Sequence, residues 1–459
     1  MKNTILKFTA LAILFSVFLS CDDFVDVELP SDQLTAPTVF QDRTTANAAM
    51  ANLYAKLRDS GLTTGSGSGL SNLMGNYADE FVYYGSVAAS TPPFYNNSLT
   101  ATNGTVAALW NDSYSQIYSA NAIIEGVYTS TALLQADRDQ LIGEALFVRA
   151  LIHFYLANLY GPVPYIMSTD YETNRHVGRL STDVVYQNVI TDLTLAQNLL
   201  PEDYLSSERI RPNKAAVRAL LARTYLYHGD WIEASNAASS VLNDSQYTLE
   251  SDIDAVFLKG STSTIWQFKP SADGINTAEG GNFVIISAPP SFVAVREELV
   301  AAFEPGDLRL THWLGTVSDG TTTWYFANKY KQQTSTGTSM EYSIMLRLSE
   351  QYLIRAEARA RQGELIGAKD DLNIIRHAAG LGDTPASSQQ EILDAIQRER
   401  RVELFTEYGH RFFDLKRNGG LDAALSPVKP GWNTTDALLP LPEVELLLNP
   451  SLAPQNTGY

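Results

Sequence analysis

The chain has 459 residues, and 45% of them are hydrophobic, which is enough apolar material for a sizeable core. Its 51 acidic and 33 basic residues give a formal net charge of −18 at pH 7, with histidine neutral. Because such a surface repels phosphate backbones, we expect no nucleic-acid partner.

The chain starts with a short basic stretch and an apolar run over residues 8–19, after which come Ser20 and the only cysteine, Cys21. The run is too short to cross a bilayer of ~30 Å, which takes about 20 residues as a helix. Its length is instead typical of a secretory signal. The sequence "FLSC" resembles the lipobox of bacterial lipoproteins, although Phe18 stands where that motif prefers leucine.

We therefore expect residues 1–20 to be a lipoprotein signal peptide and residues 21–459 to form a single mature domain. In this interpretation Cys21 is lipidated, and its acyl chains hold the protein to a membrane at ~0.8 kcal/mol per buried CH₂. The alternative is an ordinary signal peptide that ends at a cysteine by chance. No later segment is expected to span a membrane, so the lipid anchor is the only predicted membrane attachment.

The mature chain then alternates between irregular segments and pairs of predicted helices. The first irregular segment contains "DSGLTTGSGSGLSN" and the tyrosine-rich "YADEFVYYGSVAASTPPFYNNS". Its many aromatic residues argue against disorder, and long ordered loops are usually functional. Helix pairs follow at residues 146–201 and 215–242, where Gly161 and Gly229 end the first helix of each pair.

A second irregular segment covers about residues 246–340, with a short predicted strand in "STIWQFKP". A third helix pair follows at residues 352–376, with Gly363 between its helices. The pairs resemble tetratricopeptide repeats, and generic helical hairpins are the alternative. We expect a mainly α fold with long irregular loop insertions and a few short strands. Its tetratricopeptide-like helical-hairpin frame would cover about residues 40–245 and 341–415.

Enzyme signatures are scarce, because the sequence contains no HExxH, GxSxG or GxxxxGK motif. Asp79 and Glu80 form the best carboxylate pair, but adjacent side chains usually point apart, whereas a glycosidase needs two carboxyls facing each other across ~5–10 Å. Glu399 and Glu403 share a helix face among arginines, which favours salt bridges over acid–base catalysis. We expect no catalytic residue, no cofactor and no metal site.

Aromatic residues in the two irregular segments are the best candidates for a binding site. Sugars present patches of C–H that lie flat on aromatic faces, while polar side chains bind the hydroxyls. A repeat frame can bring both segments to the same end, where we expect one aromatic platform with a carboxylate beside it. The alternative for each ring is that it packs in the core. The predicted ligand-binding residues are Asp79, Tyr83, Tyr84, Tyr95, Trp313 and Trp324.

Several motifs together resemble one known family. "LRLSEQYLIRAEARARQGE", "RERRVELFTEYGHRFFDLKRNG" and "LLPLPEVELLLNPSLAPQNTGY" are similar to the C-terminal half of the SusD/RagB family of outer-membrane nutrient-binding lipoproteins. "CDDFVDVELPSDQLTAPTVFQDRTTANAAMANLYAKLRD" and "RALIHFYLANLYGPVP" match its opening and its middle. Asp22 and Asp23 are similar to the acidic signal that exports such lipoproteins to the outer leaflet. Because ligand contacts vary across the family, the resemblance implies no particular binding residues.

The resemblance implies a lipid-anchored protein on the outer membrane, facing the extracellular side, that acts as the lid of a SusC-like TonB-dependent transporter. The leading hypothesis is a non-catalytic protein that binds an oligosaccharide and delivers it to that transporter, with residues 246–340 as the ligand-loop insertion. Capture of peptides or another nutrient is the runner-up within the family. A surface glycosidase and a scaffold that binds only protein are the alternatives from other classes.

Overall fold

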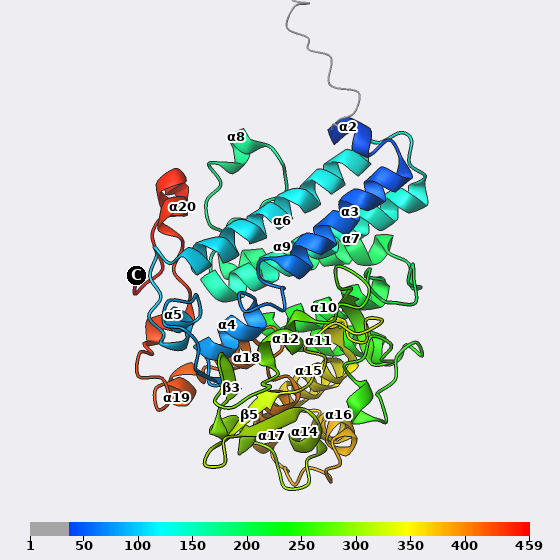
Figure 1. Ribbon diagram of the computed structural model, residues 1–459. Coiled ribbons are helices and arrows are strands. Elements are labelled where there is room, and N and C mark those ends of the chain that lie inside the picture. The colour runs from blue at the N-terminus through cyan, green and yellow to red at the C-terminus, as the bar shows by residue number, and fades with distance from the viewer. Residues whose placement is uncertain (1–35) are drawn as a thin grey trace, which may run out of the picture.

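The computed structural model describes residues 36–459 (Figure 1). The expected signal peptide, the expected lipid site at Cys21, and Asp22 and Asp23 lie outside the described residues. Within the described part of the chain, helices dominate and strands are short, which confirms the predicted mainly α class.

Long helices build the frame, and shorter helices and strands connect and cover them. The frame helices are α3 (Arg43–Asp59), α6 (Gly104–Thr129), α7 (Gln135–Tyr160), α9 (Thr182–Leu199), α10 (Lys214–His228), α11 (Trp231–Leu242), α15 (Leu348–Arg361), α16 (Leu365–Ala378) and α17 (Gln389–Glu403). The shorter helices include α2 (Ala36–Val39), α4 (Leu70–Tyr77), α5 (Pro92–Tyr95), α8 (Tyr171–Asn174), α12 (Ala278–Phe283), α13 (Glu297–Val300), α14 (Leu308–His312), α18 (His410–Arg417), α19 (Leu421–Leu425) and α20 (Glu443–Leu448). The strands are β1 (Phe81–Tyr83), β2 (Thr264–Phe268), β3 (Val293–Val295), β4 (Leu314–Ser318), β5 (Thr323–Ala327) and β6 (Ser343–Arg347).

The predicted hairpins are present as the pairs α7–α9, α10–α11 and α15–α16. Gly229 ends α10 with φ = 92°, and Gly363 separates α15 from α16 with φ = 84°. This left-handed conformation suits glycine, which has no Cβ to clash with the backbone. Ala222, Ala238 and Ala358 share a buried cluster between α10, α11 and α15, so small side chains let neighbouring hairpins approach closely.

Helix α7 lies at the centre of the frame, packed against α6 and α9. It is long and apolar enough to cross a membrane by length and composition, a property that the sequence analysis did not attribute to it. However, 89% of its most apolar window is buried inside the protein. A helix that is apolar all round belongs to the core of a large domain when neighbours cover it, and α7 does so here.

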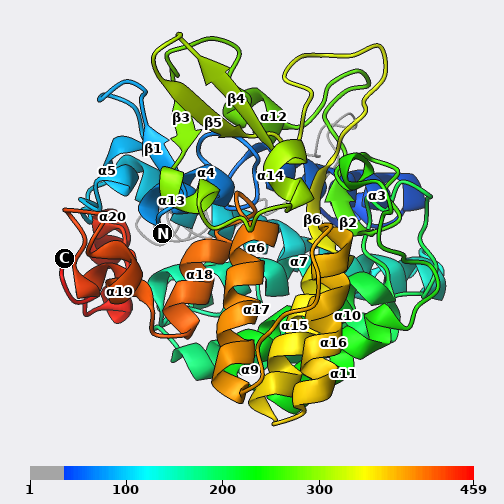
Figure 2. The same ribbon diagram turned by 90° about the horizontal axis from the view of Figure 1, so that it is seen from below.

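The two irregular segments meet in one antiparallel sheet with the strand order β1-β3-β5-β4. Strand β1 comes from the first segment and pairs with β3 of the second, with Phe81 opposite Val295 and Tyr83 opposite Val293. The predicted strand in "STIWQFKP" is β2, which pairs separately with β6. Figure 2 shows the four-stranded sheet on one side of the molecule and α9, α11, α16 and α17 on the other. The expected meeting of the two segments is therefore confirmed.

A buried ion-pair network connects this sheet region to helix α17. Arg309 binds Glu399 at 2.6 Å and Glu403 at 2.8 Å, and Arg347 also binds Glu403. Burial raises the pKa of Glu403, but the charges of Arg347 and Arg309 outweigh it and hold that pKa at about 2. The glutamates are thus structural, as expected. Their partners, however, come from α14, α16 and β6 rather than from neighbouring turns of α17.

Candidate functional site

A row of aromatic rings follows the edge where β1 ends and β3 begins. Tyr83 closes β1, and its ring lies 5.9 Å from Phe292 and 6.2 Å from Tyr95, measured between ring centroids. The backbone N–H of Tyr84 donates to the carbonyl of Phe292 at 2.7 Å, which locks the two segments together at this point. Tyr83, Tyr95 and Phe292 are half-buried, so each ring is held by packing and still reaches solvent.

Strand β5 adds a further ring at this edge, on the face of the sheet opposite to Tyr83, because Tyr83 packs against the same buried cluster as Tyr325. Successive residues of a strand point to opposite faces, so Tyr325 packs on the buried cluster beneath the sheet and Trp324 points away from it. The indole N–H of Trp324 donates to the Tyr84 hydroxyl at 3.1 Å, across 240 positions in the sequence. Tyr84 is 41% exposed and Trp324 is half-buried. We call Tyr83, Tyr84, Tyr95, Phe292 and Trp324 the aromatic row.

Lys429 supports the row from below. Its ammonium lies 4.3 Å from the centroid of the Tyr95 ring and donates to the carbonyls of Tyr95 and Asn76. Burial lowers the pKa of Lys429 to about 7, because the charged form loses hydration. A cation held under one ring face leaves the other ring face free for a ligand.

A polar cavity of about 410 Å³ borders the row. Gly67 separates the two: an added Cβ at Gly67 would lie 3.3 Å from the Phe292 ring, and the preceding residue, Ser66, lines the cavity. Both irregular segments contribute to the lining, together with Arg58 and Asp59 at the end of α3. We call the aromatic row and this cavity together the loop face.

Trp313 does not belong to the aromatic row, contrary to the sequence prediction of an exposed loop tryptophan. It follows α14 and is only 3% exposed, and its indole N–H donates to the carbonyl of Ile253 at 3.2 Å. Its ring packs edge-on against Phe257 at 5.3 Å. The turn of α14 directs this side chain into the buried cluster below β4, where no ligand can stack on it.

Asp79 is also not available as predicted. Its carboxylate is buried and accepts hydrogen bonds from Arg411, at 2.7 Å to each oxygen, and from Arg401 at 3.0 Å. Burial raises the pKa of Asp79, but the hydrogen bond and charge of Arg411 lower it overall. The carboxylate therefore joins the end of α4 to α17 and α18 and is too deeply buried to reach sugar hydroxyls.

Glu80 lies beside Asp79 in sequence but in a different environment. It is buried, and one of its oxygens accepts the backbone N–H of Thr406 at 3.1 Å. Burial raises the pKa of Glu80 to about 7. Since Asp79 is saturated by arginines and Glu80 is enclosed under β1, the pair lacks the facing arrangement across a ligand that a glycosidase requires.

The sequence did not predict Phe292 of the aromatic row, Lys429 beneath it, or the residues that line the cavity. Phe292 follows two prolines and a serine, which is the same local composition that drew attention to Tyr95 in "TPPFY". That signal was present and could have found it. Lys429 carries no comparable signal, because its role depends on contacts with residues more than 300 positions away.

A tetratricopeptide-like frame that displays exposed aromatic rings on a separate loop face is the architecture of a binding protein. Two family profiles match the chain, one described as "Starch-binding associating with outer membrane" over residues 23–226 and one described as "SusD family" over residues 314–459. The chain belongs to the SusD/RagB family.

Relatives and solved structures agree with this membership. SusD-like protein P2 of Formosa agariphila is 27% identical over 427 aligned positions, which cover 79% of this chain and 83% of the relative. A SusD superfamily protein from Bacteroides vulgatus superposes with a TM-score of 0.81 at 20% identity, covering 92% of this chain and all of that one. A laminarin-binding SusD-like protein gives a TM-score of 0.75 at 24% identity, covering 91% of this chain and 99% of that one. At these identities the structures confirm the fold.

Proposed function

We propose that this protein is a non-catalytic surface lipoprotein that binds an oligosaccharide on its loop face. The observation that carries the proposal is the aromatic row, in which Trp324 and Tyr84 from distant segments are hydrogen-bonded at 3.1 Å on the surface. Rings that are fixed by packing and still reach solvent stack on sugar C–H patches without losing much conformational freedom on binding. That a relative in this family is described as laminarin-binding supports the ligand class.

The row and the cavity supply the two kinds of contact that a sugar needs. The Trp324 N–H is already engaged by Tyr84, so the indole would offer its ring face to the ligand. The Tyr84 hydroxyl accepts that bond and keeps its own proton for a sugar hydroxyl. Polar side chains that line the cavity, among them Gln332 and Gln333, would bind hydroxyls of the adjoining sugar units.

We infer that the protein is anchored to the outer membrane through lipid on Cys21, with Asp22 and Asp23 directing it to the extracellular side. The family description, which associates these proteins with the outer membrane, supports the location.

We further propose that the protein delivers its ligand to a SusC-like TonB-dependent transporter. Gentle detergent extraction from cells that express both genes should then copurify a large β-barrel protein, and recovery of this protein alone would contradict the partnership.

A calorimetric screen tests the ligand class. The mature protein is titrated with three neutral hexasaccharides, which are built from glucose, xylose or mannose. In separate titrations it receives hydrophilic peptides of similar mass. We expect saturable binding of at least one glycan and no glycan hydrolysis on prolonged incubation. Saturable binding of peptides alone would support the runner-up, capture of another nutrient. Release of shorter sugars would instead support a glycosidase.

A further inference from the structure

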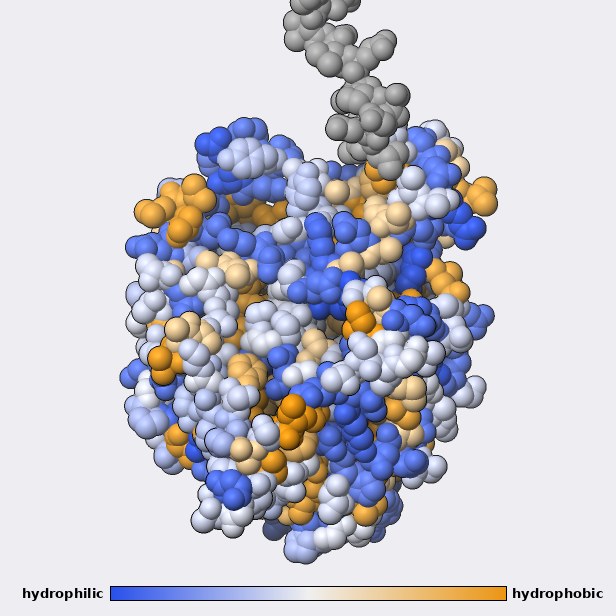
Figure 3. Space-filling view, viewed as in Figure 1, coloured by the Kyte–Doolittle hydropathy of each residue, from blue (hydrophilic) through white to orange (hydrophobic). Residues whose placement is uncertain are grey.

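A second cavity, of about 570 Å³, lies away from the loop face between α6, the segment around α8, and α20. Figure 3 shows it as a hollow with a hydrophobic floor, between the hydrophilic α8 segment and the hydrophobic surface of α20. Its volume falls within the ~300–1,000 Å³ that is usual for small-molecule sites. None of the residues that line it belongs to the loop face. We call it the α6–α20 cavity.

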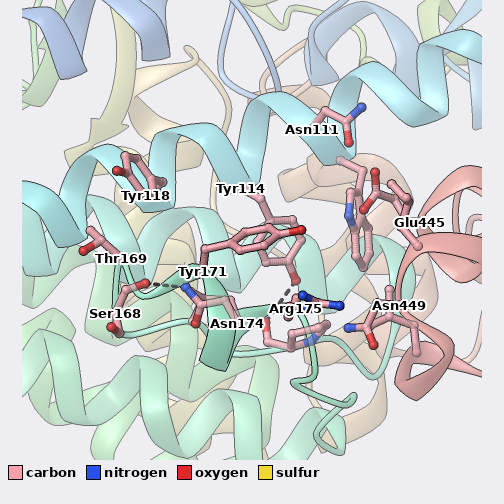
Figure 4. Close-up of a pocket in the computed structure, with 15 residues that line it drawn as sticks. Asn111, Tyr114, Tyr118, Ser168, Thr169, Tyr171, Asn174, Arg175, Glu445 and Asn449 are labelled. Atoms are coloured by element: carbon pink, nitrogen blue, oxygen red, sulfur yellow. Dashed lines mark hydrogen bonds between the residues drawn. The ribbon is translucent and has the colours of Figure 1, made fainter. Parts of the chain in front are cut away.

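Aromatic side chains form one wall of this cavity. Trp110, Tyr114 and Tyr118 are spaced four residues apart on α6, so they lie along one face of the helix. The rings of Trp110 and Tyr114 are 4.8 Å apart. Tyr171 joins them from α8, as Figure 4 shows. Tyr118 is 55% exposed and Tyr171 is 70% exposed, which is unusual for large rings that serve only to fill a core.

Polar groups with unused hydrogen-bonding capacity surround these rings. Glu445 of α20 lines the cavity, and its carboxylate has no hydrogen bond or ion pair within residues 36–459. Burial raises the pKa of Glu445, which indicates that water reaches it only in part. The indole N–H of Trp110, a residue that is only 3% exposed, likewise has no hydrogen-bond partner in that part of the chain. Buried or half-buried polar groups normally have hydrogen-bond partners, so we expect a ligand or water to bind these groups.

Other polar groups at the cavity are held in place by the protein. Asn174 donates to the carbonyl of Ser168 at 2.7 Å, which leaves its amide oxygen as an acceptor. Arg175 pairs with Glu172 at 3.3 Å, and its guanidinium lies 5.7 Å from the Tyr171 ring centroid. Several of its N–H groups remain as donors. Figure 4 shows Arg175 and Asn174 on the α8 side of the cavity and Glu445 on the opposite side.

We propose that the α6–α20 cavity is a second carbohydrate site, which takes a short neutral oligosaccharide. Ring faces together with amide, guanidinium and carboxylate groups match the C–H patches and hydroxyls of a sugar. Arg175 is already paired with Glu172, which leaves the Glu445 carboxyl without a cation, and a chain of formal charge −18 also disfavours an anionic ligand. The ligand class rests on the proposed function, but the site is separate, and a long glycan that reached both sites would gain avidity.

Fluorine NMR of the full mature chain labelled with 5-fluorotryptophan tests this proposal. Trp110 reports on the α6–α20 cavity and Trp324 on the loop face, and Trp110→Phe and Trp324→Phe variants assign their resonances. Laminarihexaose, maltohexaose and mannohexaose are the probes. We expect at least one of them to shift the Trp110 resonance saturably. The variants Tyr118→Ala and Tyr171→Ala should each weaken that response about tenfold and leave the Trp324 response unchanged.

The matched control is Tyr128→Ala, because Tyr128 is an exposed tyrosine on α6 that does not line the cavity. It should leave both responses unchanged. A Trp324 response without any Trp110 response would overturn the second site and leave the proposed function standing. A Trp110 response that survives both tyrosine substitutions would also overturn it. A Trp110 response alone would instead support the second site and contradict binding at the loop face.

Discussion

Glu80 is the residue whose burial has the clearest consequence for stability. Its pKa is raised from 4.5 to about 7 in the folded protein by burial, so the folded state binds its proton more tightly than the unfolded state does. The stability from this group is therefore fully present below pH 4.5 and is lost as pH rises through 7. A pKa shift of this size corresponds to a change of roughly 3 kcal/mol in the free energy of unfolding.

Glu80→Gln should remove this pH dependence, because the amide is neutral at every pH and its oxygen can still accept the Thr406 N–H. Urea unfolding at pH 5 and pH 8 measures the free energy of unfolding of both proteins. We expect the free energy of unfolding of the variant to exceed that of the wild type by about 2–3 kcal/mol at pH 8 and to match it near pH 5. Glu233→Gln, an exposed position on α11, is the control. Equal pH profiles for Glu80→Gln and the wild type would contradict the raised pKa.

The positions of single side chains also show which features could not be predicted from the sequence. Trp313 directly precedes β4, and Trp324 lies within β5 of the same hairpin. The end of α14 directs the Trp313 ring into the core, whereas the alternation along β5, with Trp324 opposite Val317, points the Trp324 ring away from the core. No local sequence pattern contains either outcome. Asp79 was misjudged for a related reason, since its arginine partners are more than 300 positions away.

At the scale of elements, the helix pairs were predictable and the sheet was not. The pairs follow from a helical period interrupted by Gly229 and Gly363, and both signals are local. Strands β1 and β3 are three residues each, and their pairing joins positions more than 200 apart. Stretches that short have no usable period, so only the tertiary structure defines them.

The positive φ of Gly229 and Gly363 predicts the effect of adding a side chain. Val at either position should destabilise the protein by about 1–3 kcal/mol, because a β-branched residue is strained in the left-handed region. Crowding adds nothing at Gly363, where an added Cβ would meet no atom within 4 Å. Thermal unfolding measures the loss. Gly104→Val is the control, since that glycine also has open space and its φ is not positive. Wild-type melting temperatures for both variants would contradict the hairpin assignment.

For the whole molecule, the family and the fold were accessible from sequence because their motifs extend along the chain. The α6–α20 cavity was not. Trp110, Tyr114 and Tyr118 have the spacing of an ordinary core stripe on a helix. Only the fold reveals that α8 and α20 leave part of this stripe open (Figure 4).

The attachment of the whole molecule is predicted to depend on Cys21. Cys21→Ser removes the thiol that would carry the lipid, so the variant should not incorporate labelled palmitate and should be lost from the outer cell surface. Each acyl chain contributes ~0.8 kcal/mol per buried CH₂, and the variant loses this contribution. Metabolic labelling and surface proteolysis measure both effects. Equal labelling of variant and wild type would contradict the anchor.

The most direct test of the loop face as the glycan site is titration of Trp324→Ala and Trp313→Phe with a glycan that the wild type binds. Both variants are first checked for wild-type circular dichroism. Trp324→Ala loses a half-buried ring that still reaches solvent, so its affinity should fall about tenfold or more, whereas Trp313→Phe changes only a buried ring and should bind as the wild type does. Wild-type affinity in Trp324→Ala would contradict the proposed site.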